Sequence, residues 1–393
     1  MARNDAEGFV SLSRRALIAA GALSPLTLGP LAAMAAKAPR VSRGPLIVNA
    51  LGGLENPNLG LGRRGGGPAD TDQPDVDHRA IADAKASGLS AVNITLGYVA
   101  GPTDPFEYTL KTIREWDAVL HAHSRDLIKV NHARDILRAH DEGKVGVIYG
   151  LQNAVQIGHD LTRVDTFGDL GVGIIQLTYN PANALGGGSM APENRGLTDF
   201  GREVVVRLNN RRIMVDLSHS GEHTCLDAIA ASKAPISINH TGCRALTDLP
   251  RNKTDAELRG VAEKGGFVGI FFMPFLTLSG HATADDVVAH IEHAVNVCGE
   301  DHVGVGTDGD VTAIDDLAAY QAHLAKEVAE RAKAGIGATG ERADTYPFVV
   351  DLRGVDQFEK LARLLAAKGY SQTRIEKILG LNFVRFAREV WGA

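Results

Sequence analysis

The chain has few cysteines, few aromatic residues and no excess of positive charge. Only 3 of its 393 residues are cysteine, which excludes a disulfide scaffold, and no CxxC spacing indicates a zinc finger. A formal net charge of −6 gives no basic face, so nucleic acid is not an expected partner. Hydrophobic residues make up 44% of the chain, which excludes disorder. These values are typical of a globular protein with two ordinary domains or one large α/β barrel.

The first 35 residues are predicted to be an export signal that is not part of the fold. Arg14 and Arg15 precede an apolar run without charge, residues 17–36, and Ala33-Met34-Ala35 is a candidate cleavage site. The paired arginines resemble a twin-arginine leader, which predicts a periplasmic protein with no stable membrane span after cleavage. The alternative is an uncleaved transmembrane anchor, because about 20 apolar residues are near the minimum for a span.

Residues 40–393 are predicted to form one domain in which short apolar runs alternate with amphipathic stretches. The runs are rich in Val and Ile, which is typical of parallel strands buried on both faces. Eight such runs are present, at residues 45–48, 89–95, 145–149, 173–177, 213–217, 235–238, 267–271 and 303–306. Helical patterns lie between and after them, at residues 75–86, 105–123, 133–142, 199–209, 224–232, 254–264, 284–297 and 314–334. The three cysteines, Cys225, Cys243 and Cys298, are expected to be reduced residues of the core.

Eight strands alternating with helices predict an α/β fold, the (β/α)8 or TIM barrel. Two further helices, at residues 356–368 and 372–390, are expected to pack outside the barrel. A doubly wound open sheet is the alternative, but no GxGxxG motif opens a helix after the first strand. Two long loops, at residues 52–75 and 180–198, are of a length that is usually functional or disordered.

Polar side chains follow several of the predicted strands, at the barrel end where catalytic groups lie. His219 and His240 each come directly after a buried strand, and Asp308 follows the last one. Neutral imidazole and carboxylate oxygen are suitable ligands for zinc, so these three residues are candidate metal ligands. The alternative is a hydrogen-bonded polar layer at the barrel rim. Three more polar residues follow strands, namely Gln152, Tyr179 and Asn180.

Several motifs in order resemble the renal, or membrane, dipeptidase family. They are the run at residues 171–180, Leu-Thr-Asp-Phe-Gly at 197–201, Val-Asp-Leu-Ser-His at 215–219 with Ile-Asn-His at 238–240, Pro-Arg-Asn at 250–252, His-Val-Gly-Val-Gly-Thr-Asp at 302–308 and Ile-Leu-Gly-Leu-Asn-Phe-Val-Arg at 378–385. The resemblance extends over about residues 45–390. It implies a metal-dependent barrel that cleaves dipeptides, in this family usually with two zinc ions bridged by a glutamate.

The resemblance also implies roles for individual residues. His219 and His240 correspond to metal ligands, and Asp308 to a ligand and proton acceptor. Arg251, with Arg244 nearby, corresponds to the arginine that holds the terminal carboxylate of the substrate. Tyr179 stands where the family has a histidine that supports the tetrahedral intermediate.

Three family ligands have no equivalent in this sequence. The first-strand His-x-Asp pair falls on Leu51 and Gly53, and the bridging glutamate falls on Gln152. Without these ligands, two adjacent dications lack charge compensation, so at most one zinc ion is expected, at His219, His240 and Asp308. Glu55, in the loop after the first strand, is a weaker candidate for a replacement ligand.

Besides metal-free chemistry by Tyr179 and Asp308, two functions stay open at the level of the sequence. The first is a hydrolase of dipeptides or small amides that uses one ion, with Asp308 and Tyr179 as catalytic residues and Arg251, Arg244, Gln152 and Asn180 contacting the substrate. The second is an inactive or repurposed periplasmic protein that binds or tailors a small peptide-like ligand. A homodimer stays open in both cases, and the fold alone does not select between them.

Overall fold

The computed structural model of the protein describes residues 44–59, 74, 76–101 and 103–392. The predicted leader, residues 1–35, and the glycines between positions 60 and 67 lie outside the described residues. None of the described helices is both long and apolar enough to cross a membrane.

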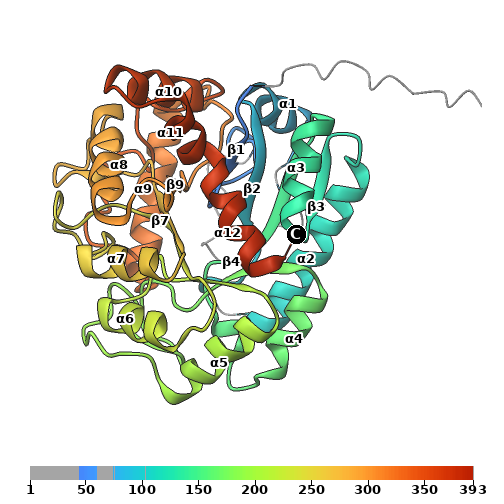
Figure 1. Cartoon of the computed structure of the whole chain (residues 1–393), viewed down its shortest axis with the longest axis vertical. Helices are drawn as coiled ribbons and strands as arrows, with labels where there is room; N and C mark the ends of the chain where they lie inside the picture. Colours follow the sequence, from blue (N-terminus) through green and yellow to red (C-terminus); the bar gives the residue numbers. More distant parts are fainter. Residues whose placement is uncertain (1–43, 60–73, 75, 102, 393) are drawn as a thin grey trace, which may run out of the picture. The chain divides into compact units, whose positions relative to one another are not determined.

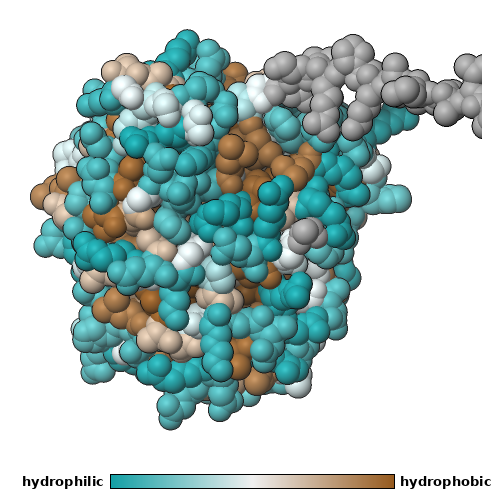
Figure 2. Space-filling model, viewed as in Figure 1, coloured by the Kyte–Doolittle hydropathy of each residue, from teal (hydrophilic) through white to brown (hydrophobic). Residues whose placement is uncertain are grey.

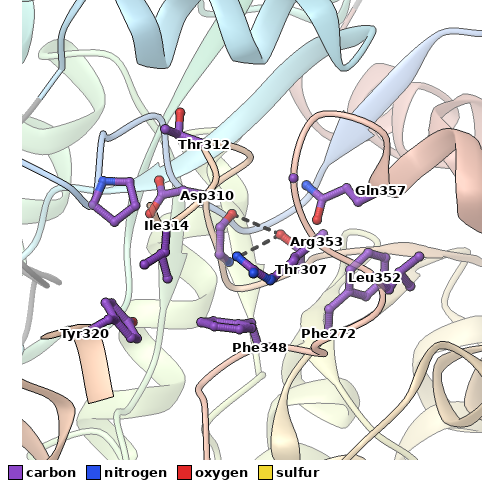
Figure 3. A pocket seen from close by; sticks show the side chains of 13 residues that line it. Phe272, Thr307, Asp310, Thr312, Ile314, Tyr320, Phe348, Leu352, Arg353 and Gln357 are labelled. Carbon is purple, nitrogen blue, oxygen red and sulfur yellow. Dashed lines mark hydrogen bonds between the residues drawn. The ribbon is translucent and has the colours of Figure 1, made fainter. Parts of the chain in front are cut away.

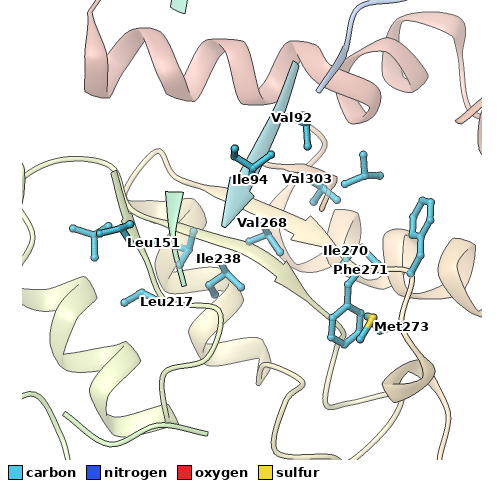
Figure 4. Close-up of a cluster of buried hydrophobic side chains, with 14 of the residues drawn as sticks. Val92, Ile94, Leu151, Leu217, Ile238, Val268, Ile270, Phe271, Met273 and Val303 are labelled. Atoms are coloured by element: carbon cyan, nitrogen blue, oxygen red, sulfur yellow. The ribbon is translucent and has the colours of Figure 1, made fainter. Parts of the chain in front are cut away.

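Eight parallel strands close into a barrel, which confirms the predicted fold (Figure 1). Neighbouring strands pair in chain order, β2 pairs with β4, and β9 pairs with β1 to complete the ring. Each strand coincides with or overlaps a predicted apolar run: β1 (Ile47–Asn49), β2 (Leu89–Thr95), β4 (Val145–Leu151), β5 (Val172–Gln176), β6 (Met214–Asp216), β7 (Ser237–Thr241), β8 (Phe267–Ile270) and β9 (Val303–Val305). Figure 4 shows part of the apolar core, in which Val92, Ile238 and Val268 are fully buried.

One further strand, β3 (Leu127–Val130), pairs with the first half of β4 and is not predicted from the sequence. The reason is Lys129, which interrupts its apolar run. The Lys129 ammonium lies 4.0 Å from the centre of the Tyr149 ring and donates to Asp117 at 2.8 Å. The cation is thus compensated, and the strand forms despite a weak pattern.

The helices follow the strands as predicted, with one addition. The predicted helices are α1 (His78–Ala86), α2 (Pro105–Ala122), α3 (Ala133–Glu142), α5 (Asp199–Asn210), α6 (Glu222–Ala231), α7 (Asp255–Glu263), α8 (Ala284–Cys298), α9 (Leu317–Lys333) and α10 (Gln357–Ala367). A capping box begins α7, in which the Glu257 carboxylate accepts from the Thr254 backbone N–H at 2.9 Å. The addition, α4 (Thr162–Asp169), has Leu161 at the N-cap position, and the Thr162 backbone N–H donates to the Asp160 carboxylate at 3.0 Å instead.

The last predicted helix is divided by a π-helical turn. It consists of α11 (Gln372–Glu376), the turn Lys377–Leu381 and α12 (Asn382–Trp391). A Cβ atom at Gly380 in this turn would lie only 2.5 Å from the Leu46 carbonyl oxygen. Because glycine has no Cβ atom, the turn can pack closely against Leu46, the residue just before β1.

The C-terminal helices pack outside the barrel, as predicted, and α12 covers the end at which the strands begin (Figure 1). Phe383 and Phe386 lie against Phe267, the first residue of β8, with ring centres 5.3 and 6.1 Å from that of Phe267. The Trp391 indole donates to the Gly173 carbonyl at 3.1 Å. Figure 2 shows hydrophobic surface beside α12 on a face that is otherwise mainly hydrophilic. This helix closes the barrel opposite the end where the polar side chains lie.

The three cysteines are buried and form no disulfide, as predicted. Burial raises the pKa of all three thiols, so they stay protonated at neutral pH. They act as small apolar core residues.

A buried histidine connects α8 to the loops after β7 and β8. His290 Nδ1 accepts from the Cys243 backbone N–H at 2.8 Å, and Nε2 lies 3.0 Å from the Leu276 carbonyl, to which it donates. Burial lowers the pKa of His290 from 6.5 to about 4. The neutral ring is therefore part of the native packing at pH 7.

Acidification is expected to destabilise the protein through His290. Between pH 6.5 and pH 4 the unfolded chain takes up a proton that the folded chain does not, so the free energy of unfolding falls by up to about 3 kcal/mol. Above pH 6.5 both states are neutral and the effect is absent. Urea unfolding of the wild type and His290→Gln at pH 7 and pH 4.5 measures it, because glutamine keeps a donor and an acceptor but does not titrate. Equal pH dependence of the two proteins would contradict the assignment.

Candidate active site

Two histidines meet at the barrel end where β6 and β7 stop. The Nε2 atoms of His219 and His240 lie 3.0 Å apart, and both rings are buried. Burial, together with the nearby Arg251 cation, lowers the pKa of both imidazoles well below 6.5. Both rings are therefore neutral at pH 7, which is the state that binds metal ions.

The Asp216 carboxylate accepts hydrogen bonds that hold β6 and β7 together. Its Oδ1 atom accepts from the Ser218 backbone N–H at 2.9 Å and from the Asn239 backbone N–H at 3.1 Å. The Ser218 hydroxyl donates to the same oxygen at 2.5 Å and accepts from the His240 backbone N–H at 3.1 Å. This network fixes β6 against β7 at the residues that precede each imidazole.

Tyr179 and Asn180, at the end of the β5 segment, contact His219 from the other side. The Tyr179 ring stacks on the imidazole with ring centres 4.2 Å apart. Asn180 Oδ1 lies 2.7 Å from His219 Nδ1, so that nitrogen carries the proton and donates. The Tyr179 hydroxyl accepts from Arg331 at 3.2 Å. Its own proton is therefore available to donate to another group.

Arg331 is a functional candidate that the sequence analysis missed. It lies in the last turn of α9 and pairs with Glu341 at 2.7 Å, and Tyr179 and Glu341 raise its pKa further. In the sequence it is one of several charged residues of an amphipathic helix, so no local pattern distinguishes it. Only the return of the chain over the barrel end brings it to Tyr179.

Arg251, the predicted carboxylate-binding residue, is buried at the same end of the barrel as the two histidines. Within the described residues its guanidinium makes one hydrogen bond, from Nη1 to the Ser218 carbonyl at 2.6 Å. Burial lowers its pKa, while the negative charges of Asp308 and Asp216 oppose this change. A buried guanidinium with spare donors is a suitable binding site for a carboxylate.

A second buried cation, Lys253, lies behind the histidines. Its ammonium donates to the Ser220 carbonyl and pairs with Glu257 at 3.2 Å, and both side chains are almost completely buried. Because its charge is compensated within the protein, Lys253 supports the loop after β6 and is not free to bind a substrate.

Asp308 follows β9 in the left-handed region, with φ +56°, and its backbone N–H donates to the Leu51 carbonyl at 2.9 Å. Its carboxylate acts electrostatically on Arg251. Asn49 joins β1 to the same loop, since its side chain donates to the Thr307 hydroxyl at 2.8 Å. The structure therefore brings Asp308 near the predicted carboxylate clamp, in a strained backbone conformation that this network supports.

The loop after β1 has no space for a larger side chain at Gly53. A Cβ atom there would lie 1.9 Å from Asp310 Oδ1, which accepts from the Glu55 backbone N–H at 2.9 Å. Leu51 is buried and apolar. Where the resemblance implies a first-strand carboxylate ligand, this chain thus places the carboxylate of Asp310, from the loop after β9.

Three residues predicted to contact the substrate have other contacts. Asn180 is buried and its amide is occupied at both ends, by His219 and by the Ile336 carbonyl at 2.8 Å. Arg244 is partly exposed and pairs with Glu222 and Asp248. The backbone carbonyl of Gln152 accepts from the Gln176 amide. A substrate role for these three stays a prediction.

The spacing of the histidine pair fits one metal ion. Two imidazole nitrogens on one tetrahedral zinc ion lie about 3.3 Å apart, close to the separation seen here. His240 Nδ1 is buried without a partner within the described part of the chain, so it is able to take the proton if Nε2 binds an ion. Among the described residues, no three His, Cys, Asp or Glu side chains gather as a complete metal site. A role of Asp308 as the third ligand stays a prediction.

A small cavity of about 40 Å³ is lined by Thr307 and Gly309, the residues on either side of Asp308 (Figure 3). Thr307 and Asp310 form part of its wall, and Phe272, Tyr320 and Phe348 give it an apolar lining. Its volume holds only a few water molecules, and neither histidine lines it. The strand ends are therefore the candidate active site.

The chain matches the family model of membrane dipeptidase (peptidase family M19) over residues 80–335. The chain belongs to the membrane dipeptidase family. The resemblance drawn from the sequence motifs is thereby confirmed.

Relatives of this family member include fungal dipeptidases. It is 28% identical over 286 residues to a dipeptidase of Claviceps purpurea, a match that covers 72% of this chain and 60% of the relative. It is 33% identical over 220 residues to an uncharacterized dipeptidase of Schizosaccharomyces pombe, which covers 53% of this chain and 52% of that one. The chain thus spans less than two thirds of the length of these relatives.

Solved structures share the barrel. An amidohydrolase from Pseudomonas aeruginosa is 31% identical with a TM-score of 0.74, over 89% of this chain and 97% of that one. A metallo peptidase from Rhodobacter sphaeroides, liganded with a phosphinate mimic of the dipeptide L-Ala-D-Ala, has a TM-score of 0.67 at 22% identity, over 88% of this chain and 99% of that one. At that identity the second likeness establishes the fold alone.

Proposed function

We propose that this membrane dipeptidase family member hydrolyses dipeptides or other small amides with one metal ion held by His219 and His240. The observation that carries the proposal is the pair of neutral imidazoles with Nε2 atoms 3.0 Å apart, beside a buried guanidinium. Membership in a family of dipeptidases supports the reaction class. A bound zinc ion supplies Lewis acidity toward water and the amide carbonyl.

The side chains of the site divide the remaining work among them. Arg251 binds the carboxylate of the substrate and orients the amide. The Tyr179 hydroxyl, which already accepts from Arg331, donates its proton in a hydrogen bond to the oxygen that becomes negative. Asp308 accepts a proton from water as the water oxygen attacks the amide carbon, and the amine leaves with that proton.

The proposal is tested by counting metal ions and turnover on the same preparation. The purified chain, loaded with zinc or manganese, is expected to retain one ion per chain by elemental analysis and to cleave members of a dipeptide panel. Two ions per chain would contradict the single-ion site. No bound metal and no turnover would favour the alternative, a protein that binds a peptide-like ligand without cleaving it.

Replacing Arg251 with lysine is expected to weaken substrate binding more than it slows the chemical step. Lysine keeps the charge but loses the planar fork, so we expect KM to rise by about 10- to 100-fold with a small change in kcat. Steady-state kinetics with a dipeptide and with the same dipeptide amidated at its C-terminus measure the effect. The amide, which lacks the carboxylate, is the matched control and should show little difference between the two proteins. An equal KM change for both substrates would contradict the clamp.

A further inference from the structure

The end of α9 and the loop after it form a strap, residues 331–341, over the β5 side of the barrel end. Arg331 at its start contacts Tyr179 and pairs with Glu341 at its end. Ile336 in its middle is buried against Val99 and Tyr179. The Thr339 backbone N–H points to the sulfur of Met190 at 3.3 Å. The strap is therefore attached to the Tyr179–Asn180 segment by polar and apolar contacts.

One contact of the strap determines how the Asn180 amide is oriented. The Ile336 carbonyl lies 2.8 Å from one end of that amide, and a carbonyl only accepts, so this end must be Nδ2. The other end is then Oδ1, which lies 2.7 Å from His219 Nδ1 and also accepts from the Ser189 hydroxyl at 3.2 Å. Asn180 is 1% exposed, so water does not compete for either end.

The orientation of the amide in turn decides which nitrogen of His219 carries the proton. An imidazole that donates from Nδ1 has its lone pair on Nε2. His219 Nε2 is the atom that faces His240. If the amide were reversed, its NH2 group would face Nδ1, which would then have to be the unprotonated nitrogen.

We propose that the strap fixes the tautomer of His219 through Asn180, which is thus a positioning residue: the Ile336 carbonyl holds Nδ2, Oδ1 accepts the Nδ1 proton, and the Nε2 lone pair is directed at His240, where a ligand would bind. The value of this lone pair for metal binding rests on the proposed function, but the tautomer itself does not. Groups that orient a metal-binding histidine in this way typically change metal affinity by 10- to 100-fold.

The tautomer is measured on the intact, metal-free chain by NMR of 15N-labelled histidine. The 15N chemical shifts distinguish protonated from unprotonated ring nitrogens, and His219→Gln identifies the resonances by their loss. We expect a protonated Nδ1 and an unprotonated Nε2 in the wild type and in Asn180→Asp, whose carboxylate still accepts from His219. In Asn180→Ala the shift difference between the two nitrogens should fall by more than half. Asn183→Ala, which removes a loop amide that contacts Asn153 and Leu177 instead, should leave it unchanged.

The link to the strap is measured by hydrogen exchange. Both Asn180→Asp and Asn180→Ala lose the donor to Ile336, so exchange of peptides from 331–341 should rise by about 5- to 10-fold, the equivalent of one hydrogen bond. Asn183→Ala should not change it. Zinc affinity, measured by competition with a chelator, should fall by about 10- to 100-fold in Asn180→Ala.

Each result has a definite meaning. A protonated Nε2 in wild-type His219, or strap exchange that is unchanged in both Asn180 variants, would overturn the inference, and the first of these needs no variant to fold. Absence of zinc binding and turnover in a wild type with the expected tautomer would overturn the proposed function and leave the inference intact.

Discussion

Changing either His219 or His240 to alanine should remove the bound metal and lower kcat/KM for a dipeptide by about 10³-fold or more, since the ion is expected to supply several kcal/mol of transition-state stabilisation. The Nε2 atoms of the two imidazoles lie 3.0 Å apart at the strand ends, as close as two nitrogen ligands of one ion. Removal of one leaves a single nitrogen ligand, which does not hold an ion against water.

The design needs a histidine control, because any alanine substitution changes local packing. His293 in α8 is suitable, since its Nε2 lies 2.7 Å from Asp255 on the outer helices, away from the strand ends. His293→Ala should retain metal content and kcat/KM within a factor of about two, the equivalent of less than 0.5 kcal/mol. Full activity in His219→Ala, or equal losses in His293→Ala and His219→Ala, would contradict the assignment of the site.

The largest expected effect on stability comes from the helix that covers the opposite end of the barrel. Phe386 is fully buried and lies against Phe267 and Phe383. Phe386→Ala should lower the free energy of unfolding by about 3–5 kcal/mol, through lost transfer free energy and the cavity left behind. Urea unfolding followed by circular dichroism measures the change.

An exposed apolar residue provides the comparison. Val206 in α5 is 45% exposed, so Val206→Ala should change the free energy of unfolding by no more than about 0.5 kcal/mol. A loss below about 1 kcal/mol in Phe386→Ala would mean that α12 is not an integral part of the barrel. Unchanged dipeptide kinetics in this variant at low temperature would show that the two ends act separately.

The barrel was predictable because its strands carry an unambiguous signal. A strand buried on both faces needs an unbroken apolar run, and each barrel strand lies in or beside such a run. β3 has no unbroken apolar run, because Lys129 interrupts it. The contacts with Asp117 and Tyr149 that compensate this charge form only in the folded chain, so no local pattern shows them. α4 is only eight residues long, and the residue that accepts from its first backbone N–H, Asp160, stands one position before the usual N-cap.

The site was predictable only where a residue lies at the end of a strand or within three residues after it. His219, His240 and Tyr179 satisfy this condition, and the structure brings them together. The contributions of Arg331 and Ile336 depend on how a segment about 150 residues away returns over the barrel end, which no local pattern encodes.

The packing of Gly53 against Asp310 makes a substitution at either position depend on the residue at the other. A side chain at position 53 cannot be added while Asp310 keeps its place, because their atoms would overlap. Gly53→Asp, which introduces the residue that the family resemblance implies at that position, therefore requires the Asp310 carboxylate to turn away and to give up the hydrogen bond that it accepts from the Glu55 backbone N–H. The effects of substitutions at positions 53 and 310 are therefore expected to depend on each other, because a shorter residue at position 310 removes the atoms that a side chain at position 53 would meet.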